Sequence, residues 1–140
     1  MYRVILFCFC ISICISFLYI NRYDYFNMVK IIKIREVFRN GRDQQKGLMY
    51  RKKLDPGVGY MFYYNPEKTA YFWMKHTEIP LDIIFIDKHK KIVHMIQNMK
   101  PHDTTSKGYP KKIKYAIEVK AGYIKRNGLI KGMQVRFTYV

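Results

Sequence analysis

The chain has 140 residues, of which 49% are hydrophobic and 26% are charged, and its formal net charge is +16. These values exclude an intrinsically disordered chain, and the length predicts one folded domain. Cys8, Cys10 and Cys14 are the only cysteines, so the rest of the chain has no disulfide and no cysteine-based metal site. No residue pattern points to a cofactor, and we expect none.

The first element in chain order is an apolar run over residues 4–20, VILFCFCISICISFLYI, which follows Arg3. Its length lies at the short end of the range for a membrane-spanning helix, and no A-x-A cleavage pattern follows it. We therefore predict an N-terminal apolar helix that acts as an uncleaved signal anchor, with a cleaved signal peptide as the alternative. Residues 1–27 then form this anchor or signal peptide plus a linker, and residues 28–140 form a single domain.

The rest of the chain has the pattern of short strands separated by turns. Isoleucines that alternate with charged residues predict a strand over 29–38. Asp43 is placed to cap a short helix that directs Leu48 and Met49 inward. A polar turn is predicted at 65–68. Further strands are predicted over 59–64, 69–75, 81–87, 91–99, 113–119 and 133–140, with a short helix or turn over 121–127.

The fold class follows from this order of elements and from the abundance of Tyr and Phe, which suit half-buried strands. We expect a mainly β (β-rich α+β) domain, a small antiparallel barrel or curled sheet with one or two short helices. Residues 100–112 form a long polar loop with two prolines, and its length makes it a candidate for function.

Four stretches of this domain resemble the DUF192 family in order and spacing. They are GLMYRKKL (47–54), GYMF (59–62), FWMKHTEIPLDIIFID (72–87) and AIEVKAGYIKRNGLIKGMQVRF (116–137). The resemblance implies a compact β-rich fold that often follows an export signal in bacteria and archaea. It implies no reaction, because the family is a domain of unknown function.

Three positions depart from the pattern of the family that the chain resembles. His76 stands where the family usually has Asn, and neither His102 nor Asp103 is the Cys that often occurs near this place. The final strand opens with Gly132-Met133-Gln134-Val135, where the family usually has Gly-Asp-x-Val. Any chemistry that depended on that Cys or Asp would be missing from this chain.

Trp73 and its neighbours are the strongest candidates for a ligand site. In a strand, Phe72 and Met74 share one face, and Tyr71, Trp73 and Lys75 share the other. An exposed Trp beside a cation suits stacking on a sugar or base, or binding of a phosphate or carboxylate. The alternative is that Trp73 belongs to the core.

Three further residues complete the candidate ligand-binding set. Arg51 and Asp82 lie in the stretches that resemble the family, and Tyr109 lies in the 100–112 loop. Arg51, Lys75 and Asp82 could equally form internal ion pairs rather than a site.

Catalytic and metal-binding patterns are weak in this sequence. His76, His89, His94 and His102 show no recognised ligand spacing, so we predict no metal site. Ser106 is the only serine of the domain and lies outside a G-x-S-x-G elbow. We therefore assign no catalytic residue.

Three classes of function are consistent with these observations. We expect a membrane-anchored or exported binding or accessory module of the bacterial cell envelope, which meets the membrane through residues 4–20 and binds an anionic ligand or an envelope component. The alternative is a hydrolase acting on an envelope polymer, which requires Arg51, Trp73, Lys75 and Asp82 to line one cleft. A nucleic-acid or anionic-surface binder driven by charge is disfavoured, because the basic composition also fits an AT-rich genome.

Overall fold

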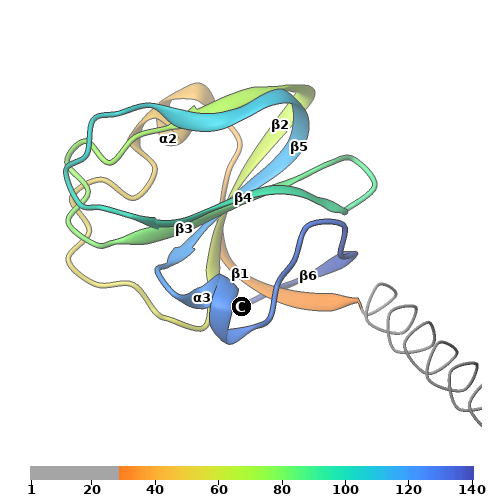
Figure 1. Ribbon diagram of the computed structural model, residues 1–140. Helices are drawn as coiled ribbons and strands as arrows, with labels where there is room; N and C mark the ends of the chain where they lie inside the picture. Colours follow the sequence, from red (N-terminus) through yellow and green to blue (C-terminus); the bar gives the residue numbers. More distant parts are fainter. Residues whose placement is uncertain (1–28) are drawn as a thin grey trace, which may run out of the picture.

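The computed structural model describes residues 29–140 and shows one mixed six-stranded sheet with the strand order β4-β3-β5-β2-β1-β6. The sheet curls into a half-barrel, with α2 and α3 at different ends of it (Figure 1). The elements are β1 (Lys30–Phe38), α2 (Gly41–Lys46), β2 (Gly59–Phe72), β3 (Leu81–Ile86), β4 (Ile92–Met99), β5 (Lys107–Lys120), α3 (Tyr123–Arg126) and β6 (Val135–Tyr139). The mainly β prediction with two short helices is confirmed for these residues.

The predicted antiparallel pairing holds for β2, β3, β4 and β5, but it is wrong for β1. That strand lies between β2 and β6 and runs parallel to both of them. Lys30 pairs with Val135, so strands from the two ends of the described chain lie side by side. Parallel neighbours need a crossover connection, and the segment containing α2 supplies it between β1 and β2.

The two edge strands of the sheet meet at one end, which closes the half-barrel there. Lys91 and Gln134 form an isolated antiparallel bridge between the β4 and β6 regions. The Ile92 amide donates to the Met133 carbonyl at 2.9 Å, and the Val135 amide donates to the Lys90 carbonyl at 2.8 Å. The other end of the sheet remains open.

The predicted turn at 65–68 is wrong, because β2 runs through it without reversing direction. The strand pairs with β5 on both sides of this segment, and only its register shifts between Tyr63 and Lys68. A local sequence such as Asn-Pro-Glu-Lys signals a bend, but the continuous partner strand keeps the chain in the sheet. Pairing with β2 also extends β5, which begins at Lys107, within the predicted 100–112 loop. The loop is therefore shorter than expected.

Both faces of the sheet are buried, and successive residues of β3 show how they are divided. Ile83 and Phe85 belong to one apolar cluster, and Ile84 and Ile86 belong to the other. The α3 helix and the segment after it cover the second cluster, while the curl of β2 and the segment around α2 cover the first. This arrangement explains the near-continuous apolar character of the strand.

The short helix α2 begins earlier than predicted. Asn40, rather than Asp43, is its N-cap, and its side-chain oxygen accepts from the Asp43 amide at 2.9 Å. Leu48 is buried, as predicted, although it lies just after the helix.

The expected N-terminal apolar helix over 4–20 lies outside the described residues. Within residues 29–140, no helix combines the length and apolar character needed to cross a membrane.

Candidate functional site

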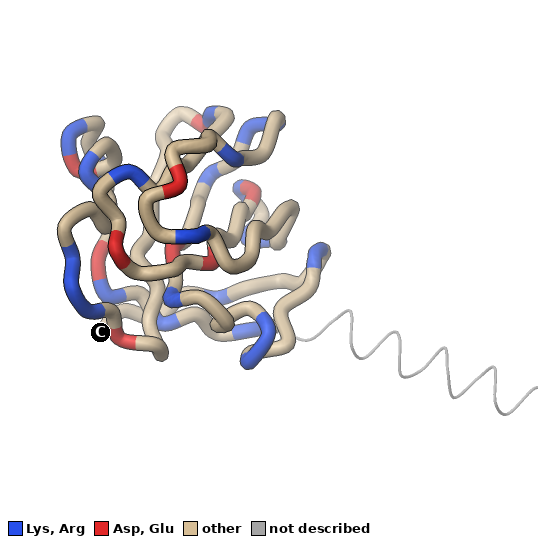
Figure 2. The backbone as a smooth tube through the Cα atoms, turned by 60° about the vertical axis from the view of Figure 1, so that its left-hand side comes forward, with Lys and Arg blue, Asp and Glu red and all other residues tan. Residues whose placement is uncertain are grey.

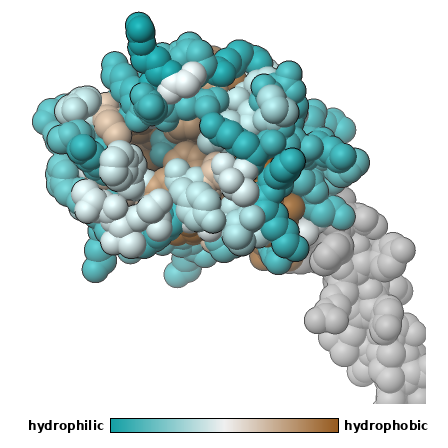
Figure 3. Space-filling model, turned by 90° about the horizontal axis from the view of Figure 1, so that it is seen from above, coloured by the Kyte–Doolittle hydropathy of each residue, from teal (hydrophilic) through white to brown (hydrophobic). Residues whose placement is uncertain are grey.

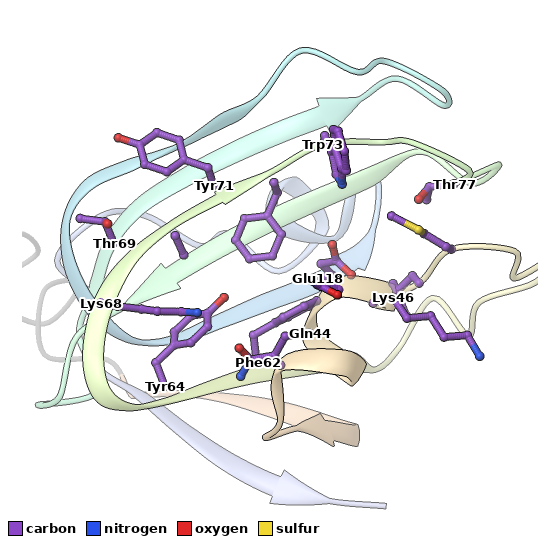
Figure 4. A pocket seen from close by; sticks show the side chains of 17 residues that line it. Gln44, Lys46, Phe62, Tyr64, Lys68, Thr69, Tyr71, Trp73, Thr77 and Glu118 are labelled. Atoms are coloured by element: carbon purple, nitrogen blue, oxygen red, sulfur yellow. The ribbon is translucent and has the colours of Figure 1, made fainter.

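A pocket of about 570 Å³ opens between α2 and the open end of β2. Seen from above, the molecule has a hollow with apolar residues deep inside it and hydrophilic residues around them (Figure 3). Both polar and aromatic side chains line the pocket, and Figure 4 shows them at close range. They include Gln44, Lys46, Phe62, Tyr64, Lys68, Thr69, Tyr71, Trp73, Thr77 and Glu118.

Glu118 supplies the carboxyl group at the floor of this pocket. Its position on β5 places it on the same face as Ala116, opposite Tyr60 of β2 and Ile83 of β3, and its side chain is 5% exposed. The Oε2 atom is buried and has no hydrogen-bond partner within the described residues. Burial raises the pKa of the Glu118 carboxyl to about 8, and the charge of Arg51 opposes this rise. A buried carboxyl without a partner is costly for folding, so it marks a candidate site.

Gly47 keeps the space above this carboxyl open. Its φ of 46° lies in the region that favours glycine, and its amide closes α2 by donating to the Asp43 carbonyl at 2.8 Å. A Cβ at position 47 would stand 3.1 Å from the Phe62 ring and 3.6 Å from Glu118 Oε2. The backbone therefore passes close to the carboxyl because residue 47 has no side chain.

A hydroxyl and an ammonium group face the pocket from β2. Burial, and then the Glu118 carboxyl, raise the pKa of the Tyr64 hydroxyl well above its ordinary value of 10. Lys68 Nζ lies 4.7 Å from the centroid of the Tyr64 ring, and Figure 4 shows it pointing towards that ring. Lys46 lies beside Glu118 in the same view, with its amine directed away from the carboxyl. The floor of the pocket is thus acidic, and its margin is basic.

Trp73 lies at the margin of the pocket and is exposed, so it does not belong to the core. Its side chain is 46% exposed, and Lys75 Nζ lies 5.2 Å from the ring centroid. The predicted division of faces is confirmed, because Phe72 and Met74 are buried while Tyr71 is exposed. Trp73 and Tyr71 both line the pocket, but Lys75 contacts only its outer edge through Trp73.

Arg51 supports the site from behind rather than lining it. Its guanidinium forms an ion pair with Glu36 and lies 4.9 Å from the centroid of the Tyr60 ring. Tyr60 is the cross-strand neighbour of Glu118, which explains how the Arg51 charge reaches that carboxyl. An adjoining cavity of about 290 Å³ contains Arg51 and Glu36 and shares Lys46 and Gly47 with the first pocket.

Asp82 and Tyr109 lie away from the pocket. Asp82 is completely buried, and its two oxygens accept from the Asn98 amide at 2.9 Å and the Ile124 amide at 3.1 Å. It therefore ties β3 to β4 and to the start of α3. Tyr109 stacks on His94, with ring centroids 5.4 Å apart. The cleft of Arg51, Trp73, Lys75 and Asp82 that the hydrolase alternative requires is not formed.

Glu118 was missed by reasoning from the sequence, although a signal for it existed. It lies in the predicted strand 113–119, between Ile117 and Val119, in an otherwise apolar stretch. Ile117 and Val119 pack in one core cluster, while Ala116 packs in the other. The alternation of a strand would have placed Glu118 on the Ala116 face, where an unpaired carboxylate is unusual.

The family model of DUF192, described as an uncharacterized ACR, matches residues 28–137. The chain belongs to the DUF192 family. No curated protein matches this DUF192 chain.

Two solved structures resemble the DUF192 domain closely. A protein of unknown function from Novosphingobium aromaticivorans DSM 12444 is 34% identical with a TM-score of 0.68, and the match covers 71% of each chain. A putative transcription regulator from Sinorhizobium meliloti 1021 is 30% identical with a TM-score of 0.67, and the match covers 69% of this chain and 74% of that one. These likenesses support the fold.

The backbone explains one departure from the DUF192 pattern. His76 has a φ of 52°, a left-handed conformation in which Asn is strongly favoured and His is tolerated. Its ring stacks on Tyr50, with centroids 5.1 Å apart, and its carbonyl accepts from the Tyr50 amide at 2.8 Å.

Across residues 29–140, no three His, Cys, Asp or Glu side chains gather as metal ligands would.

Proposed function

We propose that this DUF192 domain is a binding module for a small molecule, which it takes into the Glu118 pocket. The observation that carries the proposal is the buried Glu118 Oε2, which has no partner within the described residues. Proteins rarely keep such a group unless it serves a function, since the desolvation cost is not repaid within the fold. The aromatic side chains of Trp73 and Tyr71 at the margin offer flat surfaces on which a ligand ring or chain can pack.

Binding explains the pocket better than hydrolysis does. Glycoside hydrolysis usually needs two carboxyl groups that flank the bond to be cleaved. Among the described residues that line the pocket, Glu118 supplies the single carboxyl, and the remaining polar groups are amides, hydroxyls and amines. Because its pKa of about 8 keeps it largely protonated at neutral pH, Glu118 can both donate and accept a hydrogen bond from a ligand.

The proposal is tested by mapping where small probes bind. The full-length chain in a nonionic detergent is titrated with ethylamine, acetate and methyl glucoside, and two-dimensional ¹H–¹⁵N NMR spectra are recorded. At least one probe should shift the amides of Gly47, Ala70 and Glu118 saturably. The Ala70→Leu variant, which fills part of the pocket, should abolish these shifts.

The matched control for this variant is Ala121→Leu, which adds the same side chain outside the pocket and should leave the shifts unchanged. Dispersed spectra of both variants show that each is folded. Shifts that survive Ala70→Leu, or the lack of any saturable shift at the pocket amides, would exclude this site.

We further propose that the domain acts at a bacterial membrane, anchored or exported through residues 4–20. The support is the uncharged apolar run itself and its length. The full-length chain should remain in the membrane fraction after carbonate extraction, and a variant that lacks residues 4–20 should become soluble. Recovery of the full-length chain in the soluble fraction would contradict membrane anchoring.

Binding driven by charge alone receives less support than binding in the pocket. Lys and Arg occur in all parts of the folded domain, with Asp and Glu among them, and they do not gather into one stripe (Figure 2). A nucleic-acid surface would show a steep fall of affinity with salt. We expect only weak binding of duplex DNA at 150 mM salt, measured by fluorescence anisotropy.

A further inference from the structure

We infer that the Glu118 pocket selects a zwitterionic primary amine, whose ammonium group binds Glu118 and whose anionic group binds Lys68 at the margin. This inference rests on the proposed function and names the ligand class of the same site. Two sources carry this chemistry: a soluble amino carboxylate and the phosphoethanolamine headgroup of a lipid. Both place an ammonium and an anion at opposite ends of a short chain.

The floor of the pocket favours an ammonium group. Glu118 Oε2 is buried without a partner in the described structure, and the Gly47 backbone passes close to it. An N⁺–H donor forms a stronger hydrogen bond with a carboxylate than a neutral hydroxyl does. The aromatic side chains of Phe62 and Tyr64 also line this pocket, and aromatic rings attract cations.

The nearest cation of the fold does not neutralise this carboxyl. Arg51 forms an ion pair with Glu36 and lies over the Tyr60 ring, and it does not hydrogen-bond Glu118 in the described structure. Its charge lowers the pKa of Glu118, but burial has the larger effect and the pKa remains raised. The position for a cation beside Oε2 is therefore left to a ligand.

The margin of the pocket favours an anion. Lys68 lies over the Tyr64 ring and Lys46 lies at the end of α2, and neither forms an ion pair in the described part of the chain. A simple cation would be repelled by these two amines as it enters. A ligand that also carries a negative group gains from both ends of the pocket, which is why a zwitterion fits better than an amine alone.

Binding of the ammonium should expel the proton of Glu118. The titratable groups around this carboxyl are Arg51, whose charge lowers its pKa, and Tyr60 and Tyr64 of β2. The Lys46 amine is directed away from it. With a pKa of about 8, Glu118 carries its proton in about nine molecules of ten at pH 7, so each bound ligand should release nearly one proton.

The test uses Trp73, the single tryptophan of the chain, as a fluorescent reporter at the pocket. The full-length chain in a nonionic detergent is titrated with glycerophosphoethanolamine, 4-aminobutanoate, ethanolamine, inorganic phosphate and methyl glucoside. At least one zwitterion should bind at least tenfold more tightly than ethanolamine, phosphate and the glucoside. Calorimetry of the same zwitterion at pH 7, in two buffers of different ionisation enthalpy, should show the released proton.

Two variants test the two ends of the ligand. Glu118→Gln should weaken zwitterion binding by roughly ten- to a hundredfold and abolish proton release, since an amide neither carries the charge nor holds that proton. Lys68→Gln should weaken zwitterion binding but leave ethanolamine binding unchanged or stronger. Glu67→Gln and Lys53→Gln, which lie outside the pocket, are the matched controls and should bind as the wild type does.

The arms of the experiment separate the two sources. Preference for glycerophosphoethanolamine indicates a lipid headgroup, and the chain should then float with vesicles that contain phosphatidylethanolamine. Preference for 4-aminobutanoate indicates a soluble amino carboxylate. Binding of the glucoside or of phosphate alone with equal affinity would overturn the inference while leaving the binding module in place. Full retention of zwitterion affinity in Glu118→Gln would overturn it as well.

Discussion

Replacement of Glu118 by glutamine should remove a pH-dependent loss of stability from this domain. The carboxyl has an ordinary pKa of 4.5 in the unfolded chain and about 8 in the folded domain, because burial disfavours its ionised form. The folded state therefore holds the proton more tightly than the unfolded state does. Stability from this group is fully present below pH 4.5 and is lost as the pH rises through about 8.

The size of the effect follows from the difference between these two pKa values. At 1.36 kcal/mol for each pH unit, the full difference corresponds to about 5 kcal/mol, and the part between pH 5 and pH 7 to about half of that. Glu118 is 5% exposed, so solvent screens this effect little. Because the glutamine side chain would stay neutral throughout, the Glu118→Gln variant should gain about this much relative to the wild type over the same interval.

The measurement is urea denaturation of the full-length wild type and Glu118→Gln at pH 5, 6, 7 and 8 in the absence of amines. Contributions that the two proteins share cancel in the difference between their two free energies of unfolding. Glu67→Gln is the control, and its difference from the wild type should change little with pH. A difference for Glu118→Gln that stays constant from pH 5 to pH 7, within about 0.5 kcal/mol, would refute the account of this carboxyl.

Three further substitutions test other parts of the structure. Asp82→Ala should destabilise the domain by roughly 3–5 kcal/mol in urea denaturation at pH 7, because two buried backbone amides lose their acceptor. Arg51→Gln should raise the pKa of Glu118 further, since the positive charge that lowers it is removed, and a ¹³C NMR titration of that carboxyl would show the change. Asp103 accepts from the Thr105 amide and from Lys107, and these hydrogen bonds lower its pKa to about 2. Asp103→Asn should therefore reduce the loss of stability as the pH falls from 4 to 2, measured by thermal unfolding.

Local sequence patterns predicted most of the strands because each strand has a simple burial pattern. The alternation of β1 reflects Ile32 and Ile34 on its buried face, and the apolar run of β3 reflects burial on both faces. The parallel position of β1 and the continuous path of β2 through 65–68 were not predictable from such patterns. They depend on pairing with strands that are distant in the sequence, which leaves no local signature.

Only the part of the candidate site that follows from the alternation of side chains along a strand was predicted from the sequence. Alternation put Trp73 and Tyr71 on one face but left open whether Trp73 is exposed or belongs to the core, and both line the pocket. Asp82 was chosen for its charge within a family-like stretch, but a fully buried carboxylate that accepts from two amides has a structural role. Glu118 was not predicted, because the floor of a pocket is made of buried groups and the strand pattern of residues 113–119 does not show which buried groups line a pocket.

The pairing of β1 with β6 has a consequence for the timing of folding. Lys30 and Val135 are partners although they are roughly a hundred residues apart, so closing this part of the sheet is slow relative to local contacts. During synthesis, β1 leaves the ribosome long before its partner exists, and the chain cannot complete its sheet until β6 has followed. The complete sheet can therefore form only after nearly the whole domain has been synthesised.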